Sequence, residues 1–191
     1  MAITECLVVR RLDQTIMKVV VYISDIGSGH LSRVNAILKS LVKKVTVFEV
    51  HIRHGKNGKR VQSELSYLYS NCEVVSFVQV ESLIDWFPAE NGSPELKAIR
   101  ENIDFEYIPR SEAFILRESQ LLGTADVILS DYVAEAFSIA INLNCPAFGF
   151  MHFTWGWFFS KCYPTPLSEG SLSYLASSAL PAVIASSTFL I

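Results

Sequence analysis

Charge and cysteine are both scarce in this chain of 191 residues. Only 18% of the residues are charged and the net charge is −3 at pH 7, so nothing in the composition indicates a nucleic-acid partner. Four cysteines lie far apart in the sequence, and no two of them form a C-x-x-C pair. We therefore expect reduced thiols in a cytoplasmic protein; the alternative, two disulfides, lacks a secretory signal.

Repeats and low-complexity tracts are also missing, whereas apolar residues are plentiful. Half of the chain is hydrophobic and the mean hydropathy is +0.32, which provides for a core and argues against disorder. Residues 1–16 do not resemble a signal peptide, because their apolar run is short and two arginines follow it rather than precede it. Since Met17-Lys18 begins the first strong strand directly, we expect these residues to be an N-terminal extension. Residues 17–191 then form one α/β domain.

The last stretch of the chain, residues 170–191, has no charged side chain at all. Its length approaches that of a transmembrane helix, but it contains several serines and Pro181 and lacks basic flanks. A buried helix that runs into a strand is the preferred interpretation. Since Phe189, Leu190 and Ile191 resemble the opening of a strand, we expect a domain truncated at its C-terminus, within a longer protein.

Apolar, β-branched runs alternate with segments of helical spacing along the chain. The predicted strands are 18–24, 45–50, 73–79, 126–130 and 146–152. The predicted helices are 31–43, 61–70, 95–122 with an interruption near Pro109, and 132–143. This alternation predicts a Rossmann-like α/β fold, with a parallel sheet in the order 3-2-1-4-5 and helices on both faces.

The turn after the first strand carries the most informative motif, Gly27-Ser28-Gly29-His30. Its glycines permit backbone angles and close approaches that a Cβ would block, and the helix that follows offers unpaired N–H groups to an anion. A dinucleotide-binding motif is an alternative. It fits poorly, because Ser32 stands at the third glycine position and His30 would crowd the pyrophosphate.

His30 and Asp131 both follow strands that the predicted order places side by side. A neutral imidazole can take a proton from a hydroxyl group, and a carboxylate on its other nitrogen holds the tautomer and stabilises the cation. We predict this pair as the catalytic site. The alternative is that each residue caps the helix that follows it.

Further side chains are expected around this pair. Arg33 could pair with Asp25 or Glu49, or reach a ligand phosphate. The aromatic stretch 153–159 could stack on a ligand or cover the sheet edge. The predicted substrate-binding residues are Gly27, Ser28, Gly29, Arg33, His152 and Trp155.

Between strands two and three lies a predicted polar loop, residues 51–60. Its basic side chains could attract a phosphorylated acceptor or a membrane surface, so peripheral membrane contact is a candidate property; the basic residues are Arg53, Lys56, Lys59 and Arg60. His51-x-x-His54 could suggest a metal, but no other ligand cluster supports one. We predict no metal site.

The motif G-x-G-H-x-x-R at residues 27–33 resembles the N-terminal domain of GT-B glycosyltransferases. Similar sequences occur in bacterial N-acetylglucosaminyltransferases of peptidoglycan lipid synthesis and in the glycosyltransferase-like region of plant L-arabinokinases. A second block agrees, with residues 125–131 ending on an aspartate and Phe153-Thr154-Trp155 following the next strand. Ser28 and the single Gly29 replace the longer glycine run of the peptidoglycan enzymes, which argues against lipid-linked acceptors.

The resemblance implies a role for each matching residue. His30 corresponds to the acceptor-activating base of several members, and Asp131 to its partner in plant small-molecule transferases. It further implies an acceptor, either a small molecule or a glycan, bound in this half, and a nucleotide sugar such as a UDP-sugar bound in a second domain. The alternative is a GT-B-like module without catalysis that binds a ligand or regulates a larger protein such as a sugar kinase.

Overall fold

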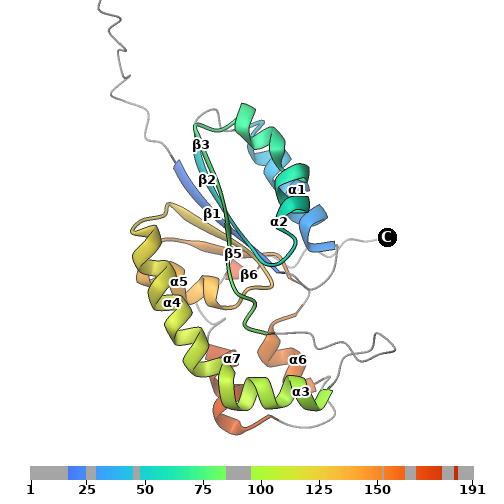
Figure 1. The fold of residues 1–191 in the computed structure, drawn as a ribbon. Helices are drawn as coiled ribbons and strands as arrows, with labels where there is room; N and C mark the ends of the chain where they lie inside the picture. Colours follow the sequence, from blue (N-terminus) through green and yellow to red (C-terminus); the bar gives the residue numbers. More distant parts are fainter. Residues whose placement is uncertain are drawn as a thin grey trace, which may run out of the picture.

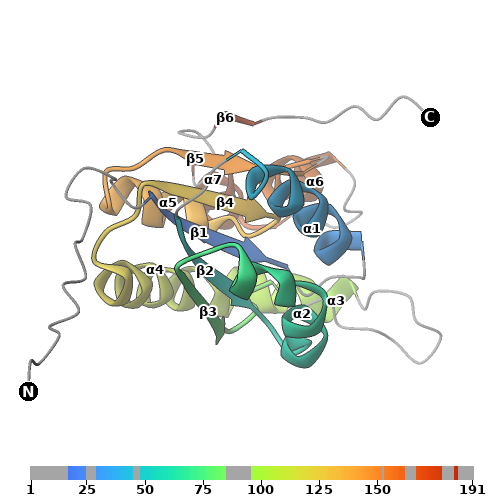
Figure 2. The same ribbon diagram turned by 90° about the horizontal axis from the view of Figure 1, so that it is seen from above.

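The computed structural model describes residues 17–24, 29–44, 48–84, 96–151, 153–161, 167–177 and 183–184. One six-stranded sheet runs in the order β3-β2-β1-β4-β5-β6, and every pair in it is parallel (Figures 1 and 2). The predicted order 3-2-1-4-5 is confirmed, with β6 added beyond β5. The strands are β1 (Met17–Ile23), β2 (Phe48–His54), β3 (Val74–Gln79), β4 (Val127–Asp131), β5 (Ala147–Gly149) and β6 (Val183–Ile184).

Helices cover both faces of the sheet, with α1 and α2 on one side and α4 and α5 on the other (Figure 1). The described helices are α1 (Gly29–Leu41), α2 (Gly58–Glu64), η1 (Ser66–Ser70), α3 (Leu96–Glu101), η2 (Asn102–Tyr107), α4 (Ile108–Leu122), α5 (Glu135–Asn142), α6 (Trp155–Lys161) and α7 (Glu169–Ser177). None of the helices in the described part of the chain is long and apolar enough to cross a membrane. Near the C-terminus the structure describes α7 and β6, whereas the predicted strand opening at residues 189–191 lies outside the described residues.

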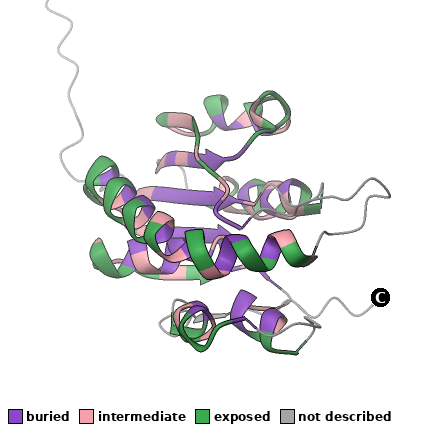
Figure 3. Ribbon diagram, turned by 60° about the horizontal axis from the view of Figure 1, so that its bottom comes forward, coloured by how far each residue is buried: buried purple, intermediate pink, exposed green. Residues whose placement is uncertain are grey.

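Strand β1 shows why both faces are buried. Val19, Val21 and Ile23 pack with Leu38 of α1 in one apolar cluster. Tyr22, whose side chain points to the opposite face, packs with aromatic and aliphatic residues of α4 and α5. Alternate side chains of a strand point to opposite faces, so a central strand with apolar residues on both requires helices on both sides. Figure 3 shows the central strands largely buried and the outer sides of the helices exposed.

Strand β2 lies further along the chain than predicted. Residues 51–54 belong to β2, so the predicted loop 51–60 is wrong over its first four residues. Ile52 is buried against the α1 side of the sheet, while Arg53 is buried on the other side with its Nε 2.7 Å from Glu118 Oε2. A distant carboxylate in α4 thus pairs with this arginine, and no residue near position 53 in the sequence indicates that partner.

The predicted interruption near Pro109 takes the form of a widened helical turn. The π-helix η2 precedes Pro109, which lies in the first turn of α4, and the helical path continues from Leu96 to Leu122. Proline lacks a backbone N–H and crowds the preceding turn, and a wider turn accommodates both effects. Among the other boundaries, β5 is shorter than the predicted strand 146–152. The predicted extension 1–16 lies outside the described residues.

Candidate functional site

The candidate site lies at the carboxyl edge of the sheet, where β1 and β4 end side by side. Ile23 pairs with Asp131 in the β1–β4 register, and His30 is the second residue of α1. Gly27 and Ser28 lie outside the described residues. Gly29 begins α1, and a Cβ added there would meet nothing within 4 Å. Open space beside Gly29 leaves room for a ligand, but the described neighbours do not themselves require a glycine at this position.

His30, Arg33 and Asp131 form one hydrogen-bonded group. His30 Nδ1 is 3.1 Å from Asp131 Oδ1, and Arg33 Nη2 is 2.8 Å from the same oxygen. Arg33 Nη2 is also 3.1 Å from His30 Nδ1. A carboxylate oxygen facing a nitrogen lone pair is repulsive, so the favoured tautomer places the proton on Nδ1, and both nitrogens donate to Oδ1. The lone pair of Nε2 is then available to accept a proton.

Burial explains why Asp131 has two donors. Its side chain is fully buried, whereas those of His30 and Arg33 are 14% and 22% exposed. An isolated buried carboxylate is strongly unfavourable, so the Arg33 guanidinium stabilises it by charge as well as by hydrogen bonding. Asp131 Oδ2 is buried and has no hydrogen-bond partner in the described part of the chain.

The structure gives Arg33 a partner that the sequence did not predict, and it excludes one alternative. Arg33 pairs with Asp131 and not with Glu49, because the end of β4 brings the Asp131 carboxylate beneath α1. Asp25, the other expected partner, lies outside the described residues. Asp131 is the last residue of β4 and does not cap α5, which begins after Ala134 without a side-chain cap. The alternative of two separate capping residues therefore does not describe this pair.

Tyr132 follows Asp131 in a backbone conformation that is unusual for a residue with a side chain. Its φ is +63°, in the left-handed region that costs L-residues free energy. The turn is held from both sides. Trp155 Nε1 donates to the carbonyl oxygen of Tyr132 at 3.0 Å, and Ser130 Oγ donates to that of Val133 at 2.7 Å. Strained residues persist where the surroundings hold them, and they cluster at functional sites.

The Tyr132 ring joins the charged group to an aromatic cluster. It contacts the His30 ring edge-on, with centroids 5.1 Å apart, and the Arg33 guanidinium lies 5.6 Å from its centroid. On its other side it contacts Phe153 and Trp155, at 5.0 and 6.2 Å. The position of the His30 ring thus depends on aromatic packing as well as on Asp131.

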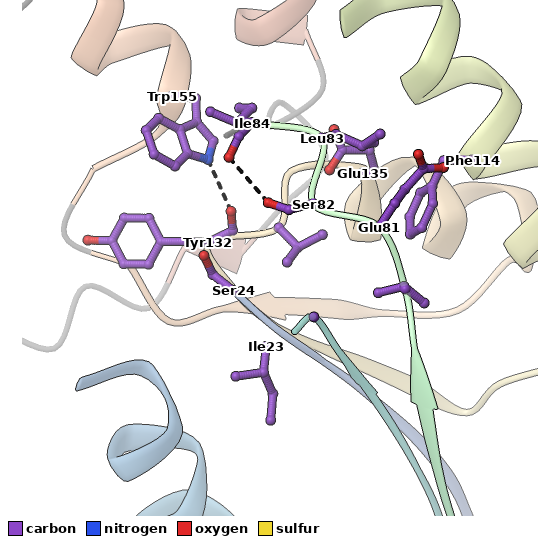
Figure 4. Close-up of a pocket in the computed structure, with 13 residues that line it drawn as sticks. Ile23, Ser24, Glu81, Ser82, Leu83, Ile84, Phe114, Tyr132, Glu135 and Trp155 are labelled. Carbon is purple, nitrogen blue, oxygen red and sulfur yellow. Dashed lines mark hydrogen bonds between the residues drawn. The ribbon is translucent and has the colours of Figure 1, made fainter. Parts of the chain in front are cut away.

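A small pocket that opens to solvent lies at the same sheet edge (Figure 4). Tyr132 lines it, together with Ser24 at the end of β1 and Trp155 at the start of α6. Phe114 of α4 and Glu135 of α5 also line it. The pocket is therefore built from the carboxyl ends of the strands and from the α4 side of the fold, and Tyr132 connects it to His30.

The remaining predicted residues divide between the site and the rest of the fold. Trp155 is buried and both lines the pocket and holds the Tyr132 turn. His152 lies outside the described residues. No group of three metal-binding side chains occurs in the described part of the chain. His51 instead bonds Glu49 and Ser76, while His54 Nδ1 is 2.8 Å from the Gly55 carbonyl oxygen.

Two residues of the site were not found from the sequence, Tyr132 and Glu135. Tyr132 directly follows Asp131, but a tyrosine gives no sign of positive φ. Burial raises the pKa of Glu135, which contacts Ser111 Oγ at 3.4 Å. Glutamate is a common residue at the start of a helix, so only the tertiary structure shows that this one is buried against a pocket.

No family model and no curated protein matches the chain. Solved plant glycosyltransferases are similar to it in structure. One is UGT2 of Phytolacca americana complexed with UDP-2fluoro-glucose and pterostilbene (18% identity, TM-score 0.47, covering 71% of this chain and 29% of that one). Another is UGT73P12 of Glycyrrhiza uralensis complexed with glycyrrhetinic acid 3-O-monoglucuronide (14% identity, TM-score 0.46, covering 86% and 41%). A third is a ugt transferase from Siraitia grosvenorii in complex with UDP (16% identity, TM-score 0.39, covering 75% and 30%). The chain spans less than half the length of each.

Proposed function

We propose that this chain is the acceptor-binding half of an inverting glycosyltransferase whose donor is a nucleotide sugar. The observation that carries the proposal is the 3.1 Å contact between His30 and Asp131 at the carboxyl edge of a parallel sheet, beside an open pocket. Open α/β sheets bind ligands at this edge. A histidine with a carboxylate on one nitrogen and a lone pair on the other is suited to activating a hydroxyl group.

In the proposed reaction, His30 Nε2 accepts the proton of an acceptor hydroxyl while its oxygen attacks the anomeric carbon of the donor. The new C–O bond forms as the bond to the nucleotide phosphate breaks, and the phosphate leaves with the bonding electrons. Attack opposite to the leaving group inverts the anomeric centre. Asp131 holds the Nδ1–H tautomer and stabilises the imidazolium, while Arg33 keeps Asp131 ionised. The acceptor, a small molecule or a glycan, lies in the pocket against Tyr132 and Trp155.

A sugar-transfer assay on the full-length protein that contains this chain tests the proposal. His30→Ala should lower kcat about 10²–10⁴-fold, the usual share of positioned proton transfer. Asp131→Asn should lower it as well, and the double variant should lose little beyond the worse single one. His51→Gln is the matched control, since His51 lies on β2 and bonds Glu49 and Ser76. Unchanged kcat in His30→Ala would refute the proposed base, and retention of the anomeric configuration would refute the inverting mechanism.

A second candidate function is a binding or regulatory module without catalysis. The observation that favours it is the 3.1 Å distance from Arg33 Nη2 to His30 Nδ1. If Arg33 donates to Nδ1, the proton resides on Nε2 and the ring has no free lone pair toward a hydroxyl group. Nitrogen-15 NMR of the His30 ring separates the two, because protonated and unprotonated ring nitrogens differ widely in chemical shift. An Nδ1–H tautomer supports the enzyme, and an Nε2–H tautomer supports the module.

We also propose a cytoplasmic location, with peripheral contact to a membrane. The free thiols of Cys72 and Cys145 support a reducing compartment. Lys56, exposed in the loop after β2, and Lys59, exposed in the first turn of α2, support attraction to an anionic surface. Arg53, buried against Glu118, does not contribute to that surface.

A further inference from the structure

The pocket beside the proposed base has an acidic and aromatic lining. Its carboxyl groups come from Glu81 and Glu135, and its aromatic rings from Phe114, Tyr132 and Trp155. Among the described residues that line it there is no lysine, arginine or histidine. Figure 4 shows Glu135 and Phe114 to the right of the pocket and Trp155 and Tyr132 to the left. Such a lining repels anions and suits a cation.

Glu81 and Glu135 differ in what compensates their charge. Arg117 Nη2 lies 3.0 Å from Glu81 Oε1, and Arg110 Nη2 lies 3.5 Å from Glu81 Oε2. Glu135, in contrast, is 4% exposed and pairs with no cationic side chain in the described part of the chain. Its carboxyl group faces Tyr107 and accepts a hydrogen bond from Ser111 Oγ at 3.4 Å, and Ser111 in turn accepts one from Tyr174. Glu135 is therefore the carboxyl group that a ligand cation can compensate.

Desolvation makes such a partner favourable. Burial raises the pKa of Glu135, which means that the ionised form is disfavoured in the protein alone. A bound ammonium group would supply the missing opposite charge, and aromatic rings on the same wall would attract it further. A carboxylate or phosphate ligand would find no cationic side chain among the described residues that line the pocket.

We propose that the pocket binds an organic cation, a small molecule in which a protonated amine is attached to an apolar body. The amine pairs with Glu135, and the apolar body lies against Phe114, Tyr132 and Trp155. This inference rests on the proposed function in one respect: it makes the acceptor an amine-bearing compound.

Three probes that share a phenyl body test the charge preference on this chain, with no donor present. They are 2-phenylethylammonium, 2-phenylethanol and phenylacetate, titrated by NMR or calorimetry at pH 7.5. We expect the ammonium probe to bind at least about tenfold more tightly than the alcohol, and phenylacetate to bind most weakly. Equal affinity for ammonium and alcohol, or preference for phenylacetate, would overturn the proposal.

Glu135→Gln should remove the ammonium preference and bring the two affinities within about twofold of each other. The matched control is Glu73→Gln, an exposed residue next to the opposite end of β3, which should keep the full preference. A preference that survives Glu135→Gln would assign the cation to another group and overturn the proposal.

A pH series on the unmodified chain needs no variant and covers the case in which Glu135→Gln does not fold. Affinity for the ammonium probe should fall as the pH is lowered from 8 to 4.5, because the carboxyl group becomes protonated, while affinity for the alcohol should stay nearly constant. The groups that face Glu135 are Tyr107, Ser111, Tyr174 and Glu81, the last paired with Arg110 and Arg117. Parallel pH dependence for both probes would contradict the proposal.

The outcome is separable from that of the glycosyl-transfer proposal. If the ammonium probe binds as expected but His30→Ala keeps full transfer, the pocket is assigned correctly and the base is not. If His30 is required for transfer but the ammonium probe shows no preference, the acceptor class alone is wrong.

Discussion

At the scale of single residues, one buried carboxylate organises the charges of the candidate site. Asp131 is fully buried, and His30 and Arg33 both approach its Oδ1 atom. The Arg33 guanidinium supplies the opposite charge. The carboxylate in turn favours the His30 tautomer with its proton on Nδ1. Removal of either the carboxylate or its cationic partner therefore changes both stability and the state of the imidazole.

Arg33→Met should destabilise the chain by about 2 kcal/mol, because it leaves a buried carboxylate without its cation. In an Asp131→Asn background the same change should cost much less, since no charge then requires compensation. Urea unfolding of the four proteins measures this coupling, and Lys43→Met, at an exposed position just after α1, is the control. Equal costs of Arg33→Met in both backgrounds would show that the ion pair contributes nothing.

Glu135 should give stability a measurable pH dependence. Burial raises its pKa in the folded state above the ordinary value of 4.5. The stability that its protonated form contributes is present below that ordinary value and is lost as the pH rises through the raised one. Compared with Glu135→Gln, the unmodified chain should thus become progressively less stable between pH 4.5 and 8. Unfolding free energies of both proteins across this range test it, and a constant difference between them would count against a raised pKa.

At the scale of elements, the turn after β4 has an unusual backbone. Tyr132 adopts a φ of +63° between a strand and α5, and contacts from Ser130 and Trp155 hold this turn. The positive φ of Tyr132 leaves Asp131 facing α1, while Tyr132 itself lines the pocket on the α4 side of the sheet. The strand end thus contributes to both parts of the site.

A comparison of two substitutions at Tyr132 should expose the strain. Both Tyr132→Gly and Tyr132→Ala lose the ring contacts, but glycine has no penalty at positive φ, so the glycine variant should be more stable by about 1 kcal/mol. At Ala113, an exposed position within α4, the order should reverse: Ala113→Gly should cost about 1 kcal/mol. Thermal unfolding ranks the variants. An alanine variant at least as stable as the glycine one would mean that the turn relaxes when the ring is removed.

At the scale of the whole molecule, the sheet brings residues about a hundred positions apart to one edge. His30 and Asp131 are separated by 101 residues, yet they meet because β1 and β4 are parallel neighbours. The two faces of the same edge differ: the His30 group lies on the α1 side, and the pocket includes residues of α4 and α5. In the proposed reaction, an acceptor held against one face would extend toward His30 on the other.

We expect this chain alone to bind UDP-sugars weakly, because the proposed division of labour assigns the donor to a second domain. Isothermal titration of a UDP-sugar into the chain measures this directly. A Kd near 1 μM, about −8 kcal/mol, would contradict that division. UDP-sugar binding that is lost in Glu135→Gln would further show that the nucleotide sugar, rather than an acceptor, occupies the pocket.

Local patterns in the sequence were sufficient to predict the strand order of the sheet and the contact between His30 and Asp131. Strand and helix periodicity sets which side chains are buried, and right-handed crossovers then leave few possible strand orders. The periodicity was less informative where a side chain far away in the sequence determines how far a strand extends. Strand β2 continues through Arg53 because Glu118 of α4 neutralises it, and no pattern near residue 53 shows that carboxylate.

By itself, therefore, the sequence determined the parallel α/β framework, the edge at which the site lies and the pairing of an imidazole with a carboxylate. Only the tertiary structure decided that Arg33 pairs with Asp131, that Tyr132 has positive φ, and that Glu135 is buried at a pocket without a cationic partner among the described residues. The physical reason is how far apart in the sequence the residues lie that determine each property. Periodicity and crossover handedness are properties of neighbouring residues, whereas burial and charge compensation depend on side chains that only the folded chain brings together.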